Sequence, residues 1–427
     1  MKDERSLPTG RLGRLGRLVS AGARAGIDLL GKRDSTHSAA AAAEVLGTLR
    51  GLAAKVGQMA SYVDGVVPEQ HRAAYETAMG ALRQAAPRSP YPDIRSLIES
   101  ELGGSIGQLF HTFDELPVAS ASIGQVHRAV VADAAGNPAH EVAVKVQHPG
   151  IVAALESDLA NASILEQMMA FSGTRRFNSQ GMLEMIRTRF REELDYRLEA
   201  QRQKQFAQVH AGDQTIRIPA VHDALSSGRV LTSEFVRGAP FEQAISASEA
   251  DRRAWAETMW RFVFKGNLVG GMFNADPHPG NYLFADGGVV TFLDYGCVQA
   301  IPPDQHEWAV AVHKTAIARD EQGFAEAGKK LLGTKPGPLE AIVLRYLRRC
   351  FEPLFVPRFR MTRQYAASLV DDFKDMTQQA LKMESVYTFA MPTEVLFMNR
   401  LQFGFYSVLA RLDVDVDYAS VERAFLK

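Results

Sequence analysis

The chain has 427 residues, of which 46% are hydrophobic and 23% are charged, a composition that excludes a mainly disordered or fibrous protein. The 48 Lys+Arg and 49 Asp+Glu nearly cancel, which excludes nucleic-acid binding through overall charge. Cys297 and Cys350 are too few for a disulfide framework or a zinc site, and they predict a reduced protein of the cytoplasm. The length predicts two or three lobes or domains.

The first 35 residues are predicted to form a basic arm. Arginine recurs every third residue with leucine beside it over 11–18, and such an amphipathic stretch can lie on an anionic membrane surface. The alternative is a solvated arm. The most apolar stretch, 259–273, contains Arg, Lys and Asn, so no membrane span is expected, and any membrane contact should be peripheral, on the inner face.

An N-terminal helical extension is predicted over 36–108, because residues 36–85 are alanine-rich and 38–60 holds strong helix formers throughout. Further helices are expected over 68–85 and 93–101, on either side of a proline-rich boundary.

A small β-containing lobe is predicted over 109–237. Its clearest signal is a hairpin of two β-rich segments, 126–131 and 142–146, around a turn-like stretch. Two inserted helices and two further strands complete the lobe, and they are expected over the following ranges: 151–171, 182–209, 216–222 and 228–235.

A Gly- and Pro-containing break at 237–240 precedes a large helical lobe, 238–427, which is interrupted by a β-rich patch over 282–293. A cleft between two lobes is a common ligand site.

Lys145 stands in the apolar strand segment Val142–Val146. In a protein-kinase-like lobe such a lysine reaches the α- and β-phosphates of the nucleotide. On its own the segment is a weak signal, and an edge-strand lysine that points to water is then the preferred interpretation.

The stretch 273–281 reads FNADPHPGN, in which two prolines and a glycine stiffen the loop between Asp276 and Asn281. The separation of five residues is that of the aspartate and asparagine in a kinase catalytic loop, where the asparagine binds Mg²⁺. Asp294 then follows a short β-rich run and begins the sequence DYG, similar to the magnesium-binding DFG motif. His278 is either a base or a structural hydrogen-bonding group, and Cys297 is expected to be unreactive.

Three further segments are informative only together with these. Residues 117–126 read PVASASIGQV and lie where a kinase's glycine-rich loop covers the phosphates. In 191–199, REELDYRLE, Asp195 and Glu199 are expected to share one helix face, with Glu193 about 120° away. A charged, solvated helix is the alternative there. Lys55 and Gln58 lie in the sequence AKVGQ, which composition alone does not single out.

In this order the motifs resemble the UbiB/AarF family of atypical kinase-like proteins, the ubiquinone-biosynthesis group, over about residues 50 to 300. The resemblance implies an α+β, two-lobed, protein-kinase-like fold with the N-terminal extension packed on the cleft. It implies ATP and Mg²⁺ as cofactors, and an ATPase or a kinase-like transferase that acts on a small lipid or quinone precursor.

The resemblance also implies roles for individual residues. Lys145 would reach the phosphates with Glu199 as its helix partner, Asp276 would be catalytic, and Asn281 and Asp294 would bind the metal. The acidic pair Glu193 and Asp195 would face Lys55 and Gln58 and occlude the peptide-substrate position. The nucleotide would lie under the alanine-rich loop, whose expected contacts are Ala119, Ser120, Ala121, Ser122, Gly124 and Val126.

The sequence departs from the family pattern in an Ala-Ser-Ala-Ser loop and in Tyr295, which replaces phenylalanine and can add a hydrogen bond. Two alternatives remain: a nucleotide-gated scaffold that binds ATP or ADP with little turnover, and an antibiotic-kinase-type phosphotransferase, whose catalytic loop also ends in the His-Pro-Gly-Asn pattern of His278–Asn281.

Overall fold

The computed structural model describes residues 88–121, 123–132, 136–154, 156, 188, 191–382 and 393–426. The helices predicted over 38–60 and 68–85, the arm at 11–18 and most of the predicted helix 151–171 lie outside these residues. The described residues divide into two units, one drawn from 88–196 with 222–232 and the other from 197–221 with 233–426.

The first unit is a small sheet covered by one helix. Its elements are α5 (Tyr91–Leu102), α6 (Ile106–Leu109), β1 (Thr112–Phe113), β2 (Ala119–Ser120), β3 (Gly124–Ala132), β4 (Pro138–Gln147), the 3₁₀ turn η1 (Asp223–Leu225) and β6 (Val230–Glu234). The strand order is β1-β3-β4-β6, with β2 also paired to β3. The predicted hairpin is therefore the centre of a five-stranded sheet.

Helix α5 forms where it was predicted because its ends are well specified. Pro92 lies in its first turn, and Gly103 ends it with a left-handed backbone, φ 74°, while donating its N–H to the Glu99 carbonyl. Ile94 and Ile98 of this helix are fully buried against Val142 and Val144 of β4.

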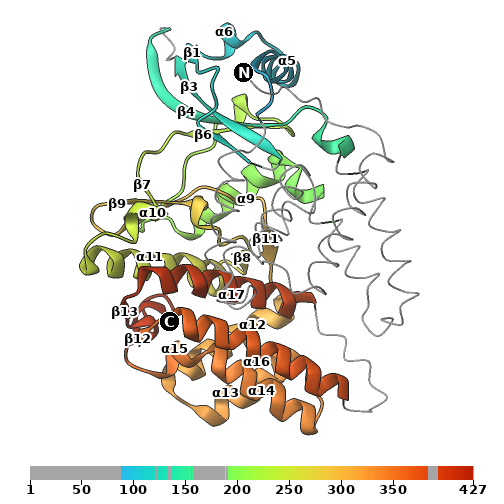
Figure 1. Ribbon diagram of the computed structural model, residues 1–427, viewed down its shortest axis with the longest axis vertical. Helices are drawn as coiled ribbons and strands as arrows, with labels where there is room; N and C mark the ends of the chain where they lie inside the picture. The colour runs from blue at the N-terminus through green and yellow to red at the C-terminus, as the bar shows by residue number, and fades with distance from the viewer. Residues whose placement is uncertain are drawn as a thin grey trace, which may run out of the picture. The chain divides into compact units, whose positions relative to one another are not determined.

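The second unit is largely helical and carries several short strands (Figure 1). The chain enters it through α9 (Tyr196–Val209). Its remaining elements are β5 (Ile216–Arg217), β7 (Ala239–Pro240), α10 (Phe241–Ala244), α11 (Glu249–Leu268), β8 (Met272–Asn274), η2 (Pro279–Asn281), β9 (Tyr282–Ala285), β10 (Val289–Phe292), β11 (Val298–Ala300), α12 (Pro303–Ala318), α13 (Glu321–Leu332), α14 (Pro338–Cys350), α15 (Glu352–Phe355), β12 (Phe359–Arg360), α16 (Arg363–Lys382), α17 (Thr393–Leu412), β13 (Asp415–Val416) and α18 (Tyr418–Arg423).

Helix α11 is the centre of this unit. It is buried on more than one face, with Trp255, Met259, Trp260 and Phe262 all in the core, as expected for a helix enclosed by other elements. It contacts α17, α18, β8 and β10. One sheet of the unit has the order β5-β10-β9-β7, and β8 pairs separately with β11.

The helix predicted over 182–209 is interrupted. Residues 191–193 are helical, Leu194 is in a turn, and α9 begins only at Tyr196. The backbone groups at the break find partners outside the helix: the Leu194 carbonyl accepts from the Gln147 side chain at 2.6 Å, and the Tyr196 N–H donates to the Gly228 carbonyl at 3.0 Å. These long-range bonds replace the helical ones that would have continued the helix.

Two further differences concern residues 197–235. The segment 197–221, expected in the small lobe, packs in the second unit. The strands expected over 216–222 and 228–235 are shorter, and they lie in different sheets, since β5 pairs with β10 whereas β6 lies beside β4.

Candidate active site

Two strand pairs bring the sequences ADPHPGN and DYG together within the second unit. In the β9–β10 hairpin Tyr282 pairs with Phe292, and the Leu293 N–H donates to the Asn281 carbonyl at 3.0 Å. In the β8–β11 pair Asn274 lies opposite Val298. The loop after β8 leads into β9, which pairs with β10, and the turn after β10 leads into β11, which pairs with β8. These two pairings fix the loop and the turn, and therefore their carboxylates, relative to each other.

Asn274 joins the two turns, and the sequence had not singled it out. Its side-chain amide donates to the Asp294 carbonyl at 2.6 Å, and its amide oxygen accepts the N–H of Asp276 at 3.0 Å. The only signal for it was local: an asparagine two residues before an aspartate can form an Asx turn through this second bond.

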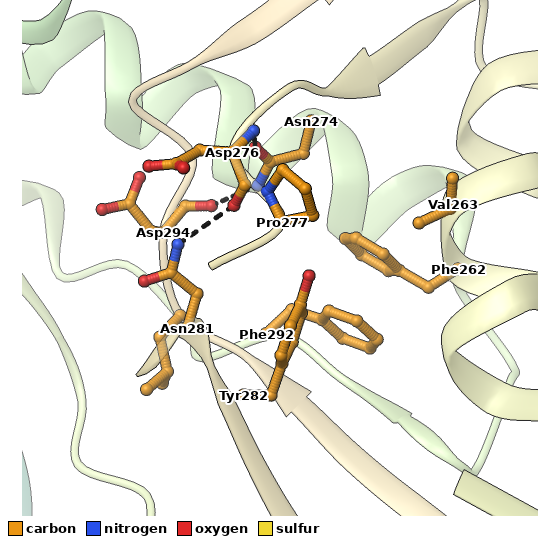
Figure 2. Close-up of a pocket in the computed structure, with 10 residues that line it drawn as sticks. Phe262, Val263, Asn274, Asp276, Pro277, Asn281, Tyr282, Phe292 and Asp294 are labelled. Atoms are coloured by element: carbon orange, nitrogen blue, oxygen red, sulfur yellow. Dashed lines mark hydrogen bonds between the residues drawn. The ribbon is translucent and has the colours of Figure 1, made fainter. Parts of the chain in front are cut away.

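The side chains of Asp276, Asn281 and Asp294 lie on one side of the loop (Figure 2). The Asn281 amide donates to the Asp276 carbonyl at 3.2 Å, and Asp294 Oδ1 accepts the Gly296 N–H at 2.9 Å. In Figure 2 the two carboxylates and the Asn281 amide oxygen point away from the aromatic side chains. The three predicted residues thus do meet, and they present oxygen atoms to one space.

Asp276, Asn281 and Asp294 line one side of a small pocket. Its other side is apolar and is formed by Phe262, Val263, Phe292 and Tyr282, and the Tyr282 hydroxyl points into the pocket (Figure 2). Burial, and then the charge of Asp276, raise the pKa of Tyr282, so the phenol is neutral. The pocket has about 10 Å³ of free space, which is about one water molecule.

Tyr295, which replaces the phenylalanine of the family pattern, forms the additional hydrogen bond expected of its hydroxyl. It is fully buried, and its hydroxyl donates to the Phe292 carbonyl at 3.1 Å. Burial raises its pKa well above the ordinary value, with a further contribution from Asp294. The tyrosine therefore ties the DYG turn to the end of β10.

His278 has a structural contact, since its Nδ1 accepts the N–H of Gly280 at 3.0 Å and so caps the short turn η2. Cys297 is partly exposed, and its carbonyl accepts the N–H of Ala275 at 2.7 Å. Its backbone thereby helps to hold the loop that begins at Ala275.

The oxygen atoms of Asp276, Asn281 and Asp294 are of the kind that Mg²⁺ prefers. Within the described ranges no three or more His, Cys, Asp or Glu side chains are grouped to hold a metal by themselves. Two carboxylates and an amide fit an ion that takes its other ligands from water and phosphate, as Mg²⁺ usually does.

Lys145 lies in an interior strand, which removes the edge-strand alternative. Strand β4 is flanked by β3 and β6, and Lys145 pairs with Val126. Val144 and Val146 are fully buried, so Lys145 points to the other face of the sheet. Its ammonium lies over the Tyr196 ring, 5.1 Å from the centroid, in a favourable cation–π contact.

Glu199 lies in the first turn of α9 and is 2% exposed. The same helix is bonded to the DYG turn, because Arg202 donates to the Gly296 carbonyl at 3.1 Å and Phe206 packs against Tyr295 with centroids 5.3 Å apart. A buried carboxylate needs a compensating partner. The helix that carries Glu199 is fixed next to the DYG turn.

The prediction that Asp195 shares a helix face with Glu199 is wrong, because Asp195 precedes the first residue of α9. The 120° relation of Glu193 to Glu199 fails for the same reason. Glu193 ends the short helical segment before the break, and the Asp195 N–H donates to the Glu192 carbonyl at 3.0 Å. Lys55 and Gln58, which were expected to face this pair, lie outside the described residues.

The alanine-rich loop is a tight hairpin between β2 and β3. Ala119 pairs with Val126 and Ser120 with Gln125, and the Ala121 N–H donates to the Gly124 carbonyl at 2.8 Å. A Cβ on Gly124 would collide with the Val146 carbonyl and lie 2.8 Å from the Tyr196 hydroxyl. Glycine is therefore required there by close packing. Ser122 lies outside the described residues.

The protein is of the kinase-like class. This follows from its small sheet with a covering helix, its largely helical second unit, and the two acidic turns, which are the turns that carry Asp276 and Asp294. A family model described as the ABC1 atypical kinase-like domain matches residues 81–328, more than half of the chain. The chain belongs to this family, which includes the UbiB/AarF proteins, and it has their two-lobed, α+β, kinase-like fold.

The names of two similar proteins are consistent with this family. The chain is 31% identical to the mitochondrial atypical kinase COQ8B of Rattus norvegicus over 290 residues, 67% of this chain and 53% of that one. It is 28% identical to AarF domain-containing protein kinase 1 of Xenopus tropicalis over 302 residues, 69% of this chain and 56% of that one. The match thus spans about half the length of these relatives.

A solved structure from Mycobacterium tuberculosis, described as the complex of Rv3197 with erythromycin, is similar in fold. The TM-score is 0.61 at 26% identity, over 86% of this chain and 90% of that one. None of the helices that the structure describes is both long and apolar enough to cross a membrane.

Proposed function

We propose that the chain binds Mg-ATP and is an atypical kinase-like ATPase, or a phosphotransferase acting on a small molecule or lipid, that supports the biosynthesis of ubiquinone or another isoprenoid quinone. The observation that carries this proposal is the meeting of Asp276, Asn281 and Asp294 beside one pocket. The pathway is supported by the relative named COQ8B and by the family.

Each residue has a role in this proposal. Asn281 and Asp294 bind the Mg²⁺, and Asp276 orients the attacking water or hydroxyl group. Lys145 neutralises charge on the phosphates, and Glu199 is its partner. The contact of Lys145 with the Tyr196 ring supports this role, because it holds the ammonium on the face of the sheet opposite the core.

The proposal also includes restricted access. Glu193 and Asp195 would face Lys55 and Gln58 of the N-terminal extension and so occlude the peptide position, which favours water or a small lipid as the phosphoryl acceptor. The basic arm at 11–18 would give peripheral contact with an anionic membrane on its inner face.

The test is equilibrium binding of ATP and ADP to the full chain, with and without Mg²⁺, followed by single-turnover hydrolysis. Asp294→Asn keeps the size of the side chain but removes a metal-binding charge, so we expect the Mg²⁺-dependent part of nucleotide binding to fall at least tenfold and hydrolysis to fall by a larger factor. Asp286→Asn is the matched control, because Asp286 is exposed in the turn at the far end of the β9–β10 hairpin.

Equal effects of the two substitutions would contradict the metal site. Loss of hydrolysis in neither variant, with binding reduced only in Asp294→Asn, would favour the nucleotide-gated scaffold. Stimulation of wild-type hydrolysis by anionic liposomes or by a phenolic quinone-precursor mimic would support the lipid-linked activity.

A second candidate is binding or phosphorylation of an antibiotic-like small molecule. It is favoured by the similarity to the structure described as an Rv3197–erythromycin complex. Equilibrium binding of erythromycin, with an aminoglycoside and choline as comparison ligands, tests this candidate. Saturable binding followed by ATP-dependent modification would replace the quinone assignment.

A further inference from the structure

Two consecutive residues at the end of β4, Gln147 and His148, are fully buried. The Gln147 side-chain amide donates to the Leu194 carbonyl at 2.6 Å, and its backbone N–H donates to the Arg229 carbonyl at 3.1 Å. These bonds fix the end of β4 within the first unit, and they therefore fix the backbone position of His148, the next residue.

His148 bonds to the alanine-rich loop at two points. Its backbone N–H donates to the Ile123 carbonyl at 2.9 Å, and its ring Nε2 lies 3.1 Å from the Ala121 carbonyl oxygen. A carbonyl oxygen can only accept, so Nε2 carries the proton, and in the neutral ring Nδ1 is then an acceptor.

That acceptor is used by Ser89, whose hydroxyl lies 2.9 Å from His148 Nδ1. Ser89 is itself held by its backbone, because its N–H donates to Gln125 Oε1 at 2.8 Å. The Gln125 amide in turn lies 2.8 Å from Nε2 of His127, which is fully buried. The imidazole of His148 thus lies between the loop and a segment preceding α5.

We propose that His148 is a positioning residue for the nucleotide: through its ring it sets the position of the alanine-rich loop and couples that position to Ser89. This inference rests on the proposed function, in which the loop covers the phosphates. If the loop moves away from His148, the bond from Nε2 to Ala121 is broken. The imidazole therefore limits the poses that the loop can offer to a nucleotide.

A matched pair of substitutions separates the two ring contacts. In His148→Gln the amide reaches about as far as Nε2 and can keep the donor to the Ala121 carbonyl. In His148→Asn the shorter amide reaches only about as far as Nδ1. It can keep the hydrogen bond with Ser89, but it loses the bond to the Ala121 carbonyl. Ser89→Ala keeps the imidazole but removes the hydroxyl that lies 2.9 Å from Nδ1 and orients the ring.

We expect the Kd for Mg-ATP to be about tenfold higher in His148→Asn than in the wild type. This factor corresponds to the loss of one hydrogen bond worth about 1.4 kcal/mol. His148→Gln should stay within about threefold of wild type by the same measure. Turnover at saturating ATP should fall by a smaller factor than the affinity in His148→Asn, because the loop is displaced while no group that touches the reacting atoms is altered. Hydrogen exchange at the amides of 121–124 should be faster in His148→Asn than in His148→Gln.

Equal nucleotide affinity and equal exchange in the two variants would overturn the inference, as would losses of affinity that follow the melting temperature instead of the contact removed. Ser89→Ala keeps the test valid where His148→Asn folds poorly, because a ring that has lost its bond to Ser89 holds Ala121 less firmly. Its Kd for Mg-ATP and its exchange at 121–124 should therefore lie between those of the wild type and His148→Asn, and wild-type values of both would contradict the inference. Absence of nucleotide binding in the wild type would refute the proposed function, and the exchange rates would still show whether His148 holds the loop.

Discussion

At the scale of single residues, His210 is a neutral imidazole inside the second unit. It is 3% exposed and lies between Phe206 and Phe262, with ring centroids 6.2 and 4.9 Å away. Burial, and then the positive charge of Lys265, lower its pKa to about 4. The unfolded chain, with a pKa near 6.5, takes up a proton before the folded chain does, so stability is lost as the pH falls from 6.5 to 4.

This gives a measurable pH dependence. Between pH 7 and pH 5 His210 should cost about 2 kcal/mol of unfolding free energy. His210→Phe keeps an aromatic ring but cannot titrate, so its loss of stability over this interval should be smaller by that amount. Denaturant unfolding of both proteins at the two pH values is the measurement, and parallel losses would show that the pKa of His210 is the same in the folded and the unfolded chain.

The candidate site was predictable where its residues are close in sequence. Asp276, Asn281 and Asp294 lie within 19 positions, and their spacing and order are local signals. Asn274 was not found, because its importance comes from a bond to Asp294, 20 residues away, that depends on the β8–β11 pairing. A three-residue strand carries too little periodicity to be recognised in sequence.

At the scale of elements, the β3–β4 hairpin depends on the absence of a side chain at Gly124. We expect Gly124→Ala to lower the unfolding free energy by about 1–3 kcal/mol, because the new methyl group would push against the backbone of Val146 and the Tyr196 hydroxyl. Gly107→Ala is the control, since nothing lies within 4 Å of the position that its new methyl group would take, and Gly107 is in helix α6.

Thermal unfolding of the two variants checks this prediction. The control should be neutral or slightly stabilising, because alanine favours helix more than glycine does. A Gly124→Ala protein that melts with the wild type would mean that β3 can move away from β4 at its first residue, contrary to the close packing.

Elements with strong local signals were predicted, and those ended by distant groups were not. The helix over 93–101 and the hairpin were recognised from end residues and periodicity. The interruption at Leu194 was not, because the bonds that replace the helical ones come from Gln147 and Gly228, both far from it along the chain. Nothing in the sequence REELDYRLE itself stops a helix.

At the scale of the whole molecule, residues beyond the family match complete the core of the second unit. The family model ends at residue 328, yet α18 packs on α11: the Tyr418 and Trp260 rings are 4.1 Å apart. Glu422, fully buried, accepts the Trp260 indole N–H at 2.9 Å and lies 2.7 Å from His313 Nδ1. Only a helical pattern was recognisable here in the sequence, since these pairings join residues more than 100 positions apart.

We therefore expect the C-terminal helix to be needed for the stability of the unit that carries the two acidic turns. Glu422→Ala leaves the buried indole N–H and imidazole without their acceptor, and should lower the unfolding free energy by about 3–5 kcal/mol. Glu326→Ala removes an exposed carboxylate that pairs with Lys329, and should leave the denaturant midpoint nearly unchanged, because an exposed ion pair contributes little to stability. Denaturant midpoints of the full chain, read by tryptophan fluorescence, compare the two. Similar midpoints would show that α18 is not coupled to α11, and that the unit keeps its stability without this buried carboxylate.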